Sequence, residues 1–421
     1  MRNLLITPEE KNHLRELARK QREYAMLPIM QEREKRWYTH NDLQGDLPMI
    51  HFETWTCEAD LLPPYQCQSE AAREIELQLN RAILNHIHID DDRVVSPFYD
   101  IGWQIQFRLF NLESVQQHAK DSEGKELIAY QYIHSIKDLK EDLPRLRPTF
   151  YAVDRQGTLA WEAFVEDVLG DILPIRFVPP GVGACLSQDV VRLMDMKPMW
   201  IALKKYPAEF HMLMQRITRD YLSFYHWLED EWLLLPNNGN FFVGQGTFSY
   251  TRDLPQEGYV YGKAACVKDM WGYMDSQETI GISPAMYHEF FFPYYLEIAK
   301  LVGLLNYGCC EPVHLLWQES ISKFPNLRKV SISPWCNEEF MGQALQGGRV
   351  IYHRKPNPNF IGVGTELDEA AFRKHILKTI HCARGCKLEF SFRDVYTLSG
   401  DLGKPRHAVQ IVRELLDSHW K

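Results

Sequence analysis

Apolar and polar residues alternate in blocks through the last third of the chain, and these blocks predict strands and helices in turn. The expected strands are the short apolar runs at 304–308, 329–333, 349–353 and 387–394. The expected helices are the amphipathic stretches at 284–303, 312–323, 336–346 and 366–385. Ser283-Pro284 is typical of a helix start, and Gly303 is typical of a helix end.

The first third of the chain predicts a charged helix, a strand and a second helix. Thr7 can cap the first helix, Pro8 suits its first position and Glu10 completes a capping box. The charged helical stretch is expected to continue to Lys35. Bulky residues from Met49 to Trp55 predict a strand. The apolar face of the helix after it consists of Ala72, Ile75, Leu79, Ala82 and Ile83.

The middle of the chain is less regular. A strand is expected at 174–180, a long amphipathic helix at 205–233, and a strand running into a loop at 241–250. The pattern does not place every strand between residues 90 and 180.

The alternation of strands and helices predicts an α/β protein with a parallel sheet. Several successive units favour a (β/α)₈ TIM barrel over a doubly wound sheet, and no Gly-rich dinucleotide fingerprint follows any strand. We expect an N-terminal helical extension over residues 1–40 and the barrel over residues 41–421.

Composition narrows the class of protein. The 421 residues are 45% hydrophobic, enough for a large core, and the net charge of -9 does not favour nucleic-acid binding. The chain has no run of ~20 apolar residues and no signal-peptide core, so a cytoplasmic protein without a membrane segment is expected. Nine cysteines, an odd number, favour reduced thiols over a disulfide framework.

Ends of barrel strands are where catalytic side chains gather. At these ends we expect Glu53, Asp275, Gln277 and Asp394 as catalytic groups. Asp275 and Gln277 equally suit a polar capping loop, and Arg393 and Asp394 equally suit an internal ion pair.

The segment YGCCEP at 307–312 is the strongest local cluster. Cys309, Cys310 and Glu311 are residue types that bind zinc, and Tyr307 can share their face of the strand as a substrate contact. The spacing is not a zinc signature in itself, because it contains no CxxC pair and no HExxH helix. A pair of small buried cysteines at a tight strand end is the alternative.

A basic loop follows the strand at 349–353. Arg354 and Lys355 precede two prolines that stiffen the loop, which suits the carboxylate or phosphate of a substrate. We expect Arg354, Lys355 and Arg393 to bind an anionic part of the ligand. A salt-bridged structural loop is the alternative.

Several of these segments together resemble the uroporphyrinogen decarboxylase superfamily, which includes corrinoid-linked methyltransferases. The resemblance begins near Arg36, and its blocks in order are RWYTHNDLQGDLP, SQETIGISPAMYHEFFFPYYLEIAKLVG, YGCCEP, LRKVSISPW, RKPNP and LEFSFRD. It implies a (β/α)₈ barrel, consistent with the alternation above.

The chain departs from both branches of that superfamily. The arginine-rich motif RQAGRYLPEY of true decarboxylases is absent, and RWYTHNDLQGD stands in its place. The His-x-Cys zinc pair of the methyltransferases reads Tyr307-Gly308-Cys309, and FSFRD has no later cysteine. The resemblance therefore implies Cys309 as a site residue, with Cys310, Glu311 or Asp394 as substitute ligands.

Three functions follow as hypotheses. The first is a zinc-dependent methyltransferase that moves a methyl group from a small methylated substrate to a corrinoid on a partner protein. The second is a metal-free decarboxylase or lyase, and the third is a barrel that binds a small molecule without catalysis. The sequence is compatible with a homodimer.

Overall fold

The computed structural model describes residues 3–420 apart from 114, 121–123 and 125. Its centre is a seven-stranded sheet in the order β1-β13-β12-β11-β10-β9-β8, in which every neighbouring pair is parallel. The strands are β1 (Met49–Phe52), β8 (Val182–Gly183), β9 (Trp271–Met274), β10 (Leu304–Tyr307), β11 (Leu327–Ile332), β12 (Ile351–Arg354) and β13 (Leu388–Phe392).

Three two-stranded pairs stand outside this sheet. One is parallel, β2 (Tyr99–Gly102) with β7 (Ile175–Val178). Two are antiparallel: β3 (Ile105–Arg108) with β6 (Phe150–Val153), and β4 (Gln116–Lys120) with β5 (Glu126–Tyr132). The strand expected at 174–180 is therefore present, but it pairs with β2. Within the described residues the fold is mixed α/β with a large parallel sheet, and the expected closed eight-stranded ladder is not shown.

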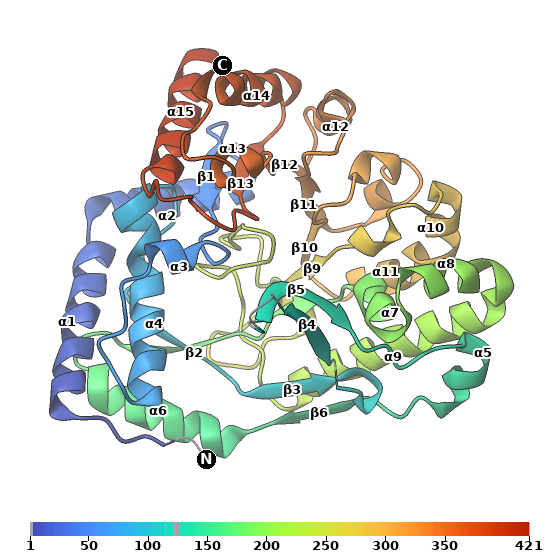
Figure 1. Cartoon of the computed structure of the whole chain (residues 1–421), viewed down its shortest axis with the longest axis horizontal. Coiled ribbons are helices and arrows are strands. Elements are labelled where there is room, and N and C mark those ends of the chain that lie inside the picture. Colours follow the sequence, from blue (N-terminus) through green and yellow to red (C-terminus); the bar gives the residue numbers. More distant parts are fainter. Residues whose placement is uncertain (1–2, 114, 121–123, 125, 421) are drawn as a thin grey trace.

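Helices surround the sheet (Figure 1). The first group is α1 (Pro8–Ala25), α2 (Pro28–Asn41), α3 (Glu58–Leu61), α4 (Glu70–Leu84), α5 (Leu139–Asp142), α6 (Arg155–Leu169), α7 (Leu186–Met194), α8 (Met196–Lys205) and α9 (Pro207–Asp230). The second group is α10 (Pro284–Phe290), α11 (Phe292–Ala299), α12 (Glu338–Leu345), α13 (Asn359–Gly362), α14 (Glu369–Cys382) and α15 (Lys404–His419).

Two expected helices are each interrupted. The N-terminal helix stops before Pro28, because proline has no backbone N–H to continue the ladder, and α2 begins there. The helix expected at 284–303 breaks at Phe291, which is followed by Phe292 and Pro293 at the start of α11. The capping box of Thr7 and Glu10 is confirmed: each side chain accepts a hydrogen bond from the backbone N–H of the other.

Two other expectations are wrong. The stretch at 312–323 forms only short 3₁₀ turns at Val313–Leu315 and Ile321–Lys323. The segment at 241–250 forms a single antiparallel bridge between Phe242 and Phe248, with a tight loop between them. Gly244 and Gly246 in that loop have φ near +80°, a region that glycine occupies readily.

This loop lies inside the curve of the sheet, within the long segment between α9 and β9 at the centre of Figure 1. Asn306 on β10 donates a hydrogen bond to the Val243 carbonyl, and Lys329 on β11 donates one to Thr247. Ser391 on β13 donates to the Gly246 carbonyl. The loop thus fills the interior where a barrel would hold layers of side chains. None of the described helices is both long and apolar enough to span a membrane.

Candidate functional site

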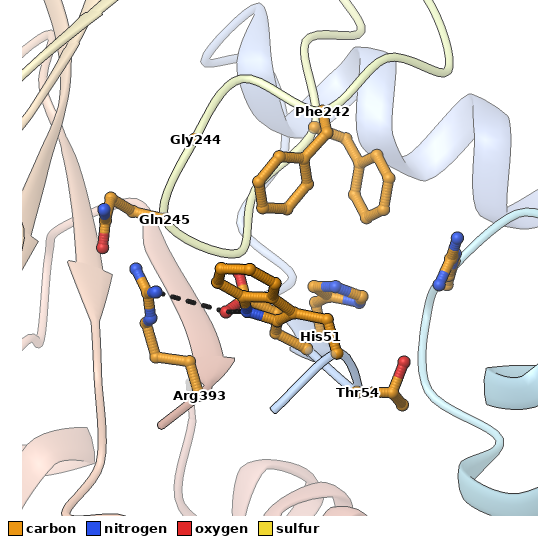
Figure 2. A pocket seen from close by; sticks show the side chains of 10 residues that line it. His51, Thr54, Phe242, Gly244, Gln245 and Arg393 are labelled. Carbon is orange, nitrogen blue, oxygen red and sulfur yellow. Dashed lines mark hydrogen bonds and ion pairs between the residues drawn. The ribbon is translucent and has the colours of Figure 1, made fainter. Parts of the chain in front are cut away.

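The carboxyl ends of the parallel strands meet at one edge of the sheet, and a cavity of about 420 Å³ opens beside them (Figure 2). Such a volume is in the range of small-molecule sites. Polar and aromatic side chains from β1, from the loop at 241–250 and from the end of β13 share its wall. The lining residues are His51, Glu53, Thr54, Trp55, Arg93, Phe242, Gly244, Gln245, Phe248 and Arg393.

Arg393 joins the cavity to the neighbouring strand ends. Its Nη2 lies 3.2 Å from Glu53 Oε1, and its Nε lies 3.5 Å from Asp394 Oδ2. Its Nη1 is buried and has no hydrogen-bond partner. The guanidinium therefore keeps a donor that the described residues do not use, although an unpaired buried donor costs free energy.

His51, two residues before Glu53, faces the same cavity. Its Nδ1 lies 2.9 Å from Asp91 Oδ2. Burial alone would raise the pKa of Asp91, but the hydrogen bonds from His51 and from the backbone N–H groups of Phe52 and Arg93 outweigh burial and lower the pKa to about 2. Asp91 is therefore a carboxylate at neutral pH.

The thiols of Cys309 and Cys310 lie together at the end of β10. Their sulfurs are 3.6 Å apart, and Cys310 Sγ is 3.8 Å from Asp394 Oδ2. The Cys309 thiol donates to Cys310, and this hydrogen bond lowers the pKa of Cys310 and raises that of Cys309. The structure thus brings together three of the predicted site residues from two strands.

Two buried acids, Glu311 and Asp275, follow the ends of the strands β10 and β9, respectively. Glu311 accepts hydrogen bonds from the backbone N–H groups of Ser276 and Cys309, at 2.9 and 2.8 Å. Burial, and then the charge of Asp275, raises the pKa of Glu311 to about 7. Burial also raises the pKa of Asp275, whose Oδ2 accepts a hydrogen bond from Tyr273 and whose Oδ1 has no partner.

Lys355 is a buried cation that contacts the backbone of Cys309. It is 2% exposed, and its Nζ donates to Gln245 Oε1 at 2.9 Å and to the Cys309 carbonyl at 3.2 Å. Burial lowers the pKa of this ammonium group, while the charges of the two cysteines act in the opposite direction. Lys355 therefore connects the thiol pair to the wall of the cavity through Gln245.

Of the predicted residues, Glu53 and Arg393 line the cavity, and three others lie outside both the cavity wall and the group around the thiols. Tyr307 is buried among aromatic rings, and its hydroxyl bonds those of Ser276 and Tyr287. Arg354 points to the opposite side of β12, where it bonds the carbonyls of Ile332 and Ser333 and lies 3.2 Å from Glu338. Gln277 donates to Glu278 in a 3₁₀ turn (Gln277–Thr279). Substrate contacts by Tyr307 or Arg354 gain no support from this geometry.

The thiol pair fits two positions of a metal site. In a tetrahedral zinc site, with Zn–S bonds near ~2.3 Å, neighbouring sulfurs lie about 3.8 Å apart. Glu311 fits less well than Asp394, since both of its oxygens already accept backbone hydrogen bonds. Among the described residues, the only group of three or more His, Cys, Asp or Glu whose ligand atoms all lie within 4.8 Å of one another is His13, Cys67 and Glu76, so Cys309, Cys310 and Asp394 do not meet that spacing together.

Sequence reasoning missed His51, Asp91, Arg93 and the loop residue Gln245. His51 could have been predicted, because alternate residues of a strand share a face and Glu53, two residues later, was already a candidate. No sequence pattern marks Arg93 or Gln245, since both lie in irregular segments that reach the cavity only in the folded chain.

Neither a protein-family model nor a curated protein sequence matches this chain. Among solved structures it is similar to a methyltransferase from Methanosarcina mazei, with 11% sequence identity and a TM-score of 0.48. The match covers 91% of this chain and 98% of that one. A similarity of this degree does not identify the family or the activity.

Proposed function

We propose that this chain is an enzyme that transfers a methyl group from a small methylated compound, with a metal ion held at the thiol pair of Cys309 and Cys310. The observation that supports the proposal is the 3.6 Å separation of these sulfurs, which Lys355 and Gln245 connect to the wall of a cavity of small-molecule size. The resemblance of YGCCEP and its flanking blocks to the uroporphyrinogen decarboxylase superfamily supplies the class of reaction.

Cys309, Cys310 and Asp394 would hold the ion, and zinc is the metal that this donor set favours. When bound, it would supply Lewis-acid activation of the methylated heteroatom or of a thiolate. The charge of Lys355 favours the thiolate form of both cysteines, but the hydrogen bond to Cys310 and burial still raise the pKa of Cys309 overall. Arg393 holds Asp394 and Glu53 in place by ion pairs. A corrinoid on a partner protein is the proposed methyl acceptor.

The first experiment measures bound zinc per chain in protein purified without added metal or chelator. Wild type is compared with Cys309→Ser and Cys310→Ser. Cys266→Ser is the matched control, because Cys266 is exposed and precedes the amino end of β9, whereas the two thiols follow the carboxyl end of β10. We expect near-stoichiometric zinc in wild type and the control, and loss in both site variants. Wild-type protein that stays metal-free after incubation with zinc would overturn the metal-dependent reading.

The second experiment offers a panel of methylated amines, thiols and methoxy compounds with cob(I)alamin as the acceptor. Formation of methylcobalamin is followed by its absorbance. Turnover that is lost in Cys309→Ser supports methyl transfer. If the zinc-loaded protein is inactive on every compound, both with and without a corrinoid protein, the result counts against methyl transfer.

A metal-free decarboxylase or lyase is the second candidate, because two arginines and two acids with raised pKa values lie near the strand ends. Arg93 and Arg393 line the cavity, while burial keeps Asp275 and Glu311 able to donate protons by raising the pKa of each. Release of CO₂ from small carboxylic acids by chelator-treated protein would favour this candidate over methyl transfer.

A further inference from the structure

We infer that His51, oriented by Asp91, is the proton-transferring group of the cavity, and that the cavity takes a small carboxylate with an apolar body. The inference goes beyond the proposed function, because it concerns β1 and the cavity wall and does not require a metal at the thiol pair.

Asp91 is fixed from several directions. Its Oδ2 accepts hydrogen bonds from the backbone N–H of Phe52 at 2.7 Å and from Asn85 Nδ2 at 2.8 Å, in addition to Nδ1 of His51. Its Oδ1 accepts from the backbone N–H of Arg93 at 3.1 Å. The residue is buried. A carboxylate held this firmly sets the position of the imidazole that bonds it.

The bond to Asp91 also sets the tautomer of His51. A carboxylate accepts and cannot donate, so Nδ1 carries the proton and Nε2 carries the lone pair. Within the described part of the chain, Nε2 makes no hydrogen bond. The ring packs against Phe248, with centroids 4.9 Å apart, and belongs to the cavity wall (Figure 2). The free lone pair is thus available to a ligand.

The ligand class follows from the other side chains of the wall. Arg393 is 8% exposed, and its unpartnered Nη1 offers a charged donor. Figure 2 shows its guanidinium pointing toward Gln245, across the cavity from the aromatic side chain of Phe242. Arg93 adds a second cation, and Trp55 and Phe248 add apolar surface. A ligand with a carboxylate on an apolar body can accept a hydrogen bond from Arg393 Nη1 and pack against the rings of Trp55 and Phe248.

The proton transfer can be written in full. His51 Nε2 takes a proton from a C–H, N–H or O–H bond of the ligand, and the electron pair of that bond stays on the ligand. The imidazolium that forms is neutralised by Asp91, which stays ionised. The proton then returns to the product, so His51 ends in its starting state.

Chemical modification tests the ligand class and the lone pair together. Diethylpyrocarbonate attacks free imidazole nitrogens, and mass spectrometry follows His51 with the exposed His226 as an internal control. We expect His51 to react, and benzoate at about four times its Kd to slow the reaction about fivefold. Benzamide, which has the same shape without the charge, should protect much less. The assay uses chelator-treated chain, so its result does not depend on the proposed metal.

Equal protection by benzoate and benzamide, or no protection by either, would overturn the ligand class. Arg393→Lys keeps the positive charge while removing the forked donor, so it should weaken protection by benzoate relative to wild type. If His51 does not react in the absence of benzoate, its Nε2 has no free lone pair and the inference is wrong.

Imidazole ¹⁵N spectra of selectively labelled chain test the role of Asp91 as a positioning residue. We expect the Nδ1–H tautomer for His51 in wild type, and loss of that signature in Asp91→Asn. Asp91→Glu, which keeps the charge, should restore it in part. An Nε2–H tautomer in wild type would reject the assignment without any variant.

Discussion

Lys329 and Glu389 form an ion pair 2.7 Å long in which neither side chain has any exposed surface. The two residues come from β11 and β13, on either side of β12, and the pair lies under the loop at 241–250. His40 and His353 lie 3.4 and 3.7 Å from the same carboxylate. Burial lowers the pKa of His353 to about 3, so this imidazole is neutral and Lys329 is the principal cation facing Glu389.

Replacing Lys329 alone should therefore be costly. Lys329→Met leaves Glu389 buried without its cation, which typically costs about 3–5 kcal/mol in the free energy of unfolding. Adding Glu389→Gln should recover a large part of the loss. Urea unfolding measures both, with Lys11→Met as the control because the Lys11–Asp167 pair has the same length but is exposed and contributes about 0–1 kcal/mol. Equal losses for the two lysines would contradict a buried charge pair.

Glu311 should make stability depend on pH in a defined direction. Its pKa is about 7 in the folded chain and near 4.5 when unfolded, so the folded state holds the proton more tightly. The resulting stabilisation is fully present below pH 4.5 and is lost as pH rises toward 7, by up to about 3 kcal/mol. Glu311→Gln should flatten this part of the curve of unfolding free energy against pH. An unchanged slope in the variant would show that Glu311 is not the group responsible.

Cys310 should be alkylated before Cys309. The hydrogen bond from Cys309 lowers the pKa of Cys310, and Cys310 is also the more exposed of the two. Thiolate is the reactive form, so iodoacetamide followed by peptide mass spectrometry should find Cys310 modified first. Cys309→Ala removes the hydrogen bond and should slow the reaction at Cys310. Faster alkylation in that variant would mean that access controls reactivity and the hydrogen bond does not.

Glu10 should matter more to stability than its partner Thr7. Thr7→Ala removes one cap bond and should cost about 1 kcal/mol. Glu10 also accepts hydrogen bonds from the backbone N–H groups of Gln68 and Ser69, which lie before α4. Glu10→Ala leaves these donors unpaired, so it should cost about 2–3 kcal/mol in thermal or chemical unfolding. If Glu10→Ala lowers the free energy of unfolding less than Thr7→Ala does, the hydrogen bonds from Gln68 and Ser69 to Glu10 do not contribute to stability.

Local patterns predicted the elements whose formation depends on neighbours in the sequence. The capping box of Thr7 and Glu10 and the strands β10 to β13 were visible, because helix caps and short apolar runs act over a few residues. By the same rule, the stretch at 241–250 predicted a strand running into a loop. It became a loop because its residues bond the inner faces of β10, β11 and β13, which no local pattern records.

The sequence by itself determined that the chain builds parallel strands whose carboxyl ends carry Glu53, Cys309, Cys310, Arg393 and Asp394. Only the tertiary structure decided which of these side chains meet. Alternation along a strand predicted that Tyr307 shares the face of Cys309, but Gly308, with φ +99°, turns the backbone between them. The partners of Cys310 and His51 are Asp394 and Asp91, which are distant in sequence and come within reach only when the strands register side by side. Such contacts depend on packing across the whole sheet, and that information is not local to any segment.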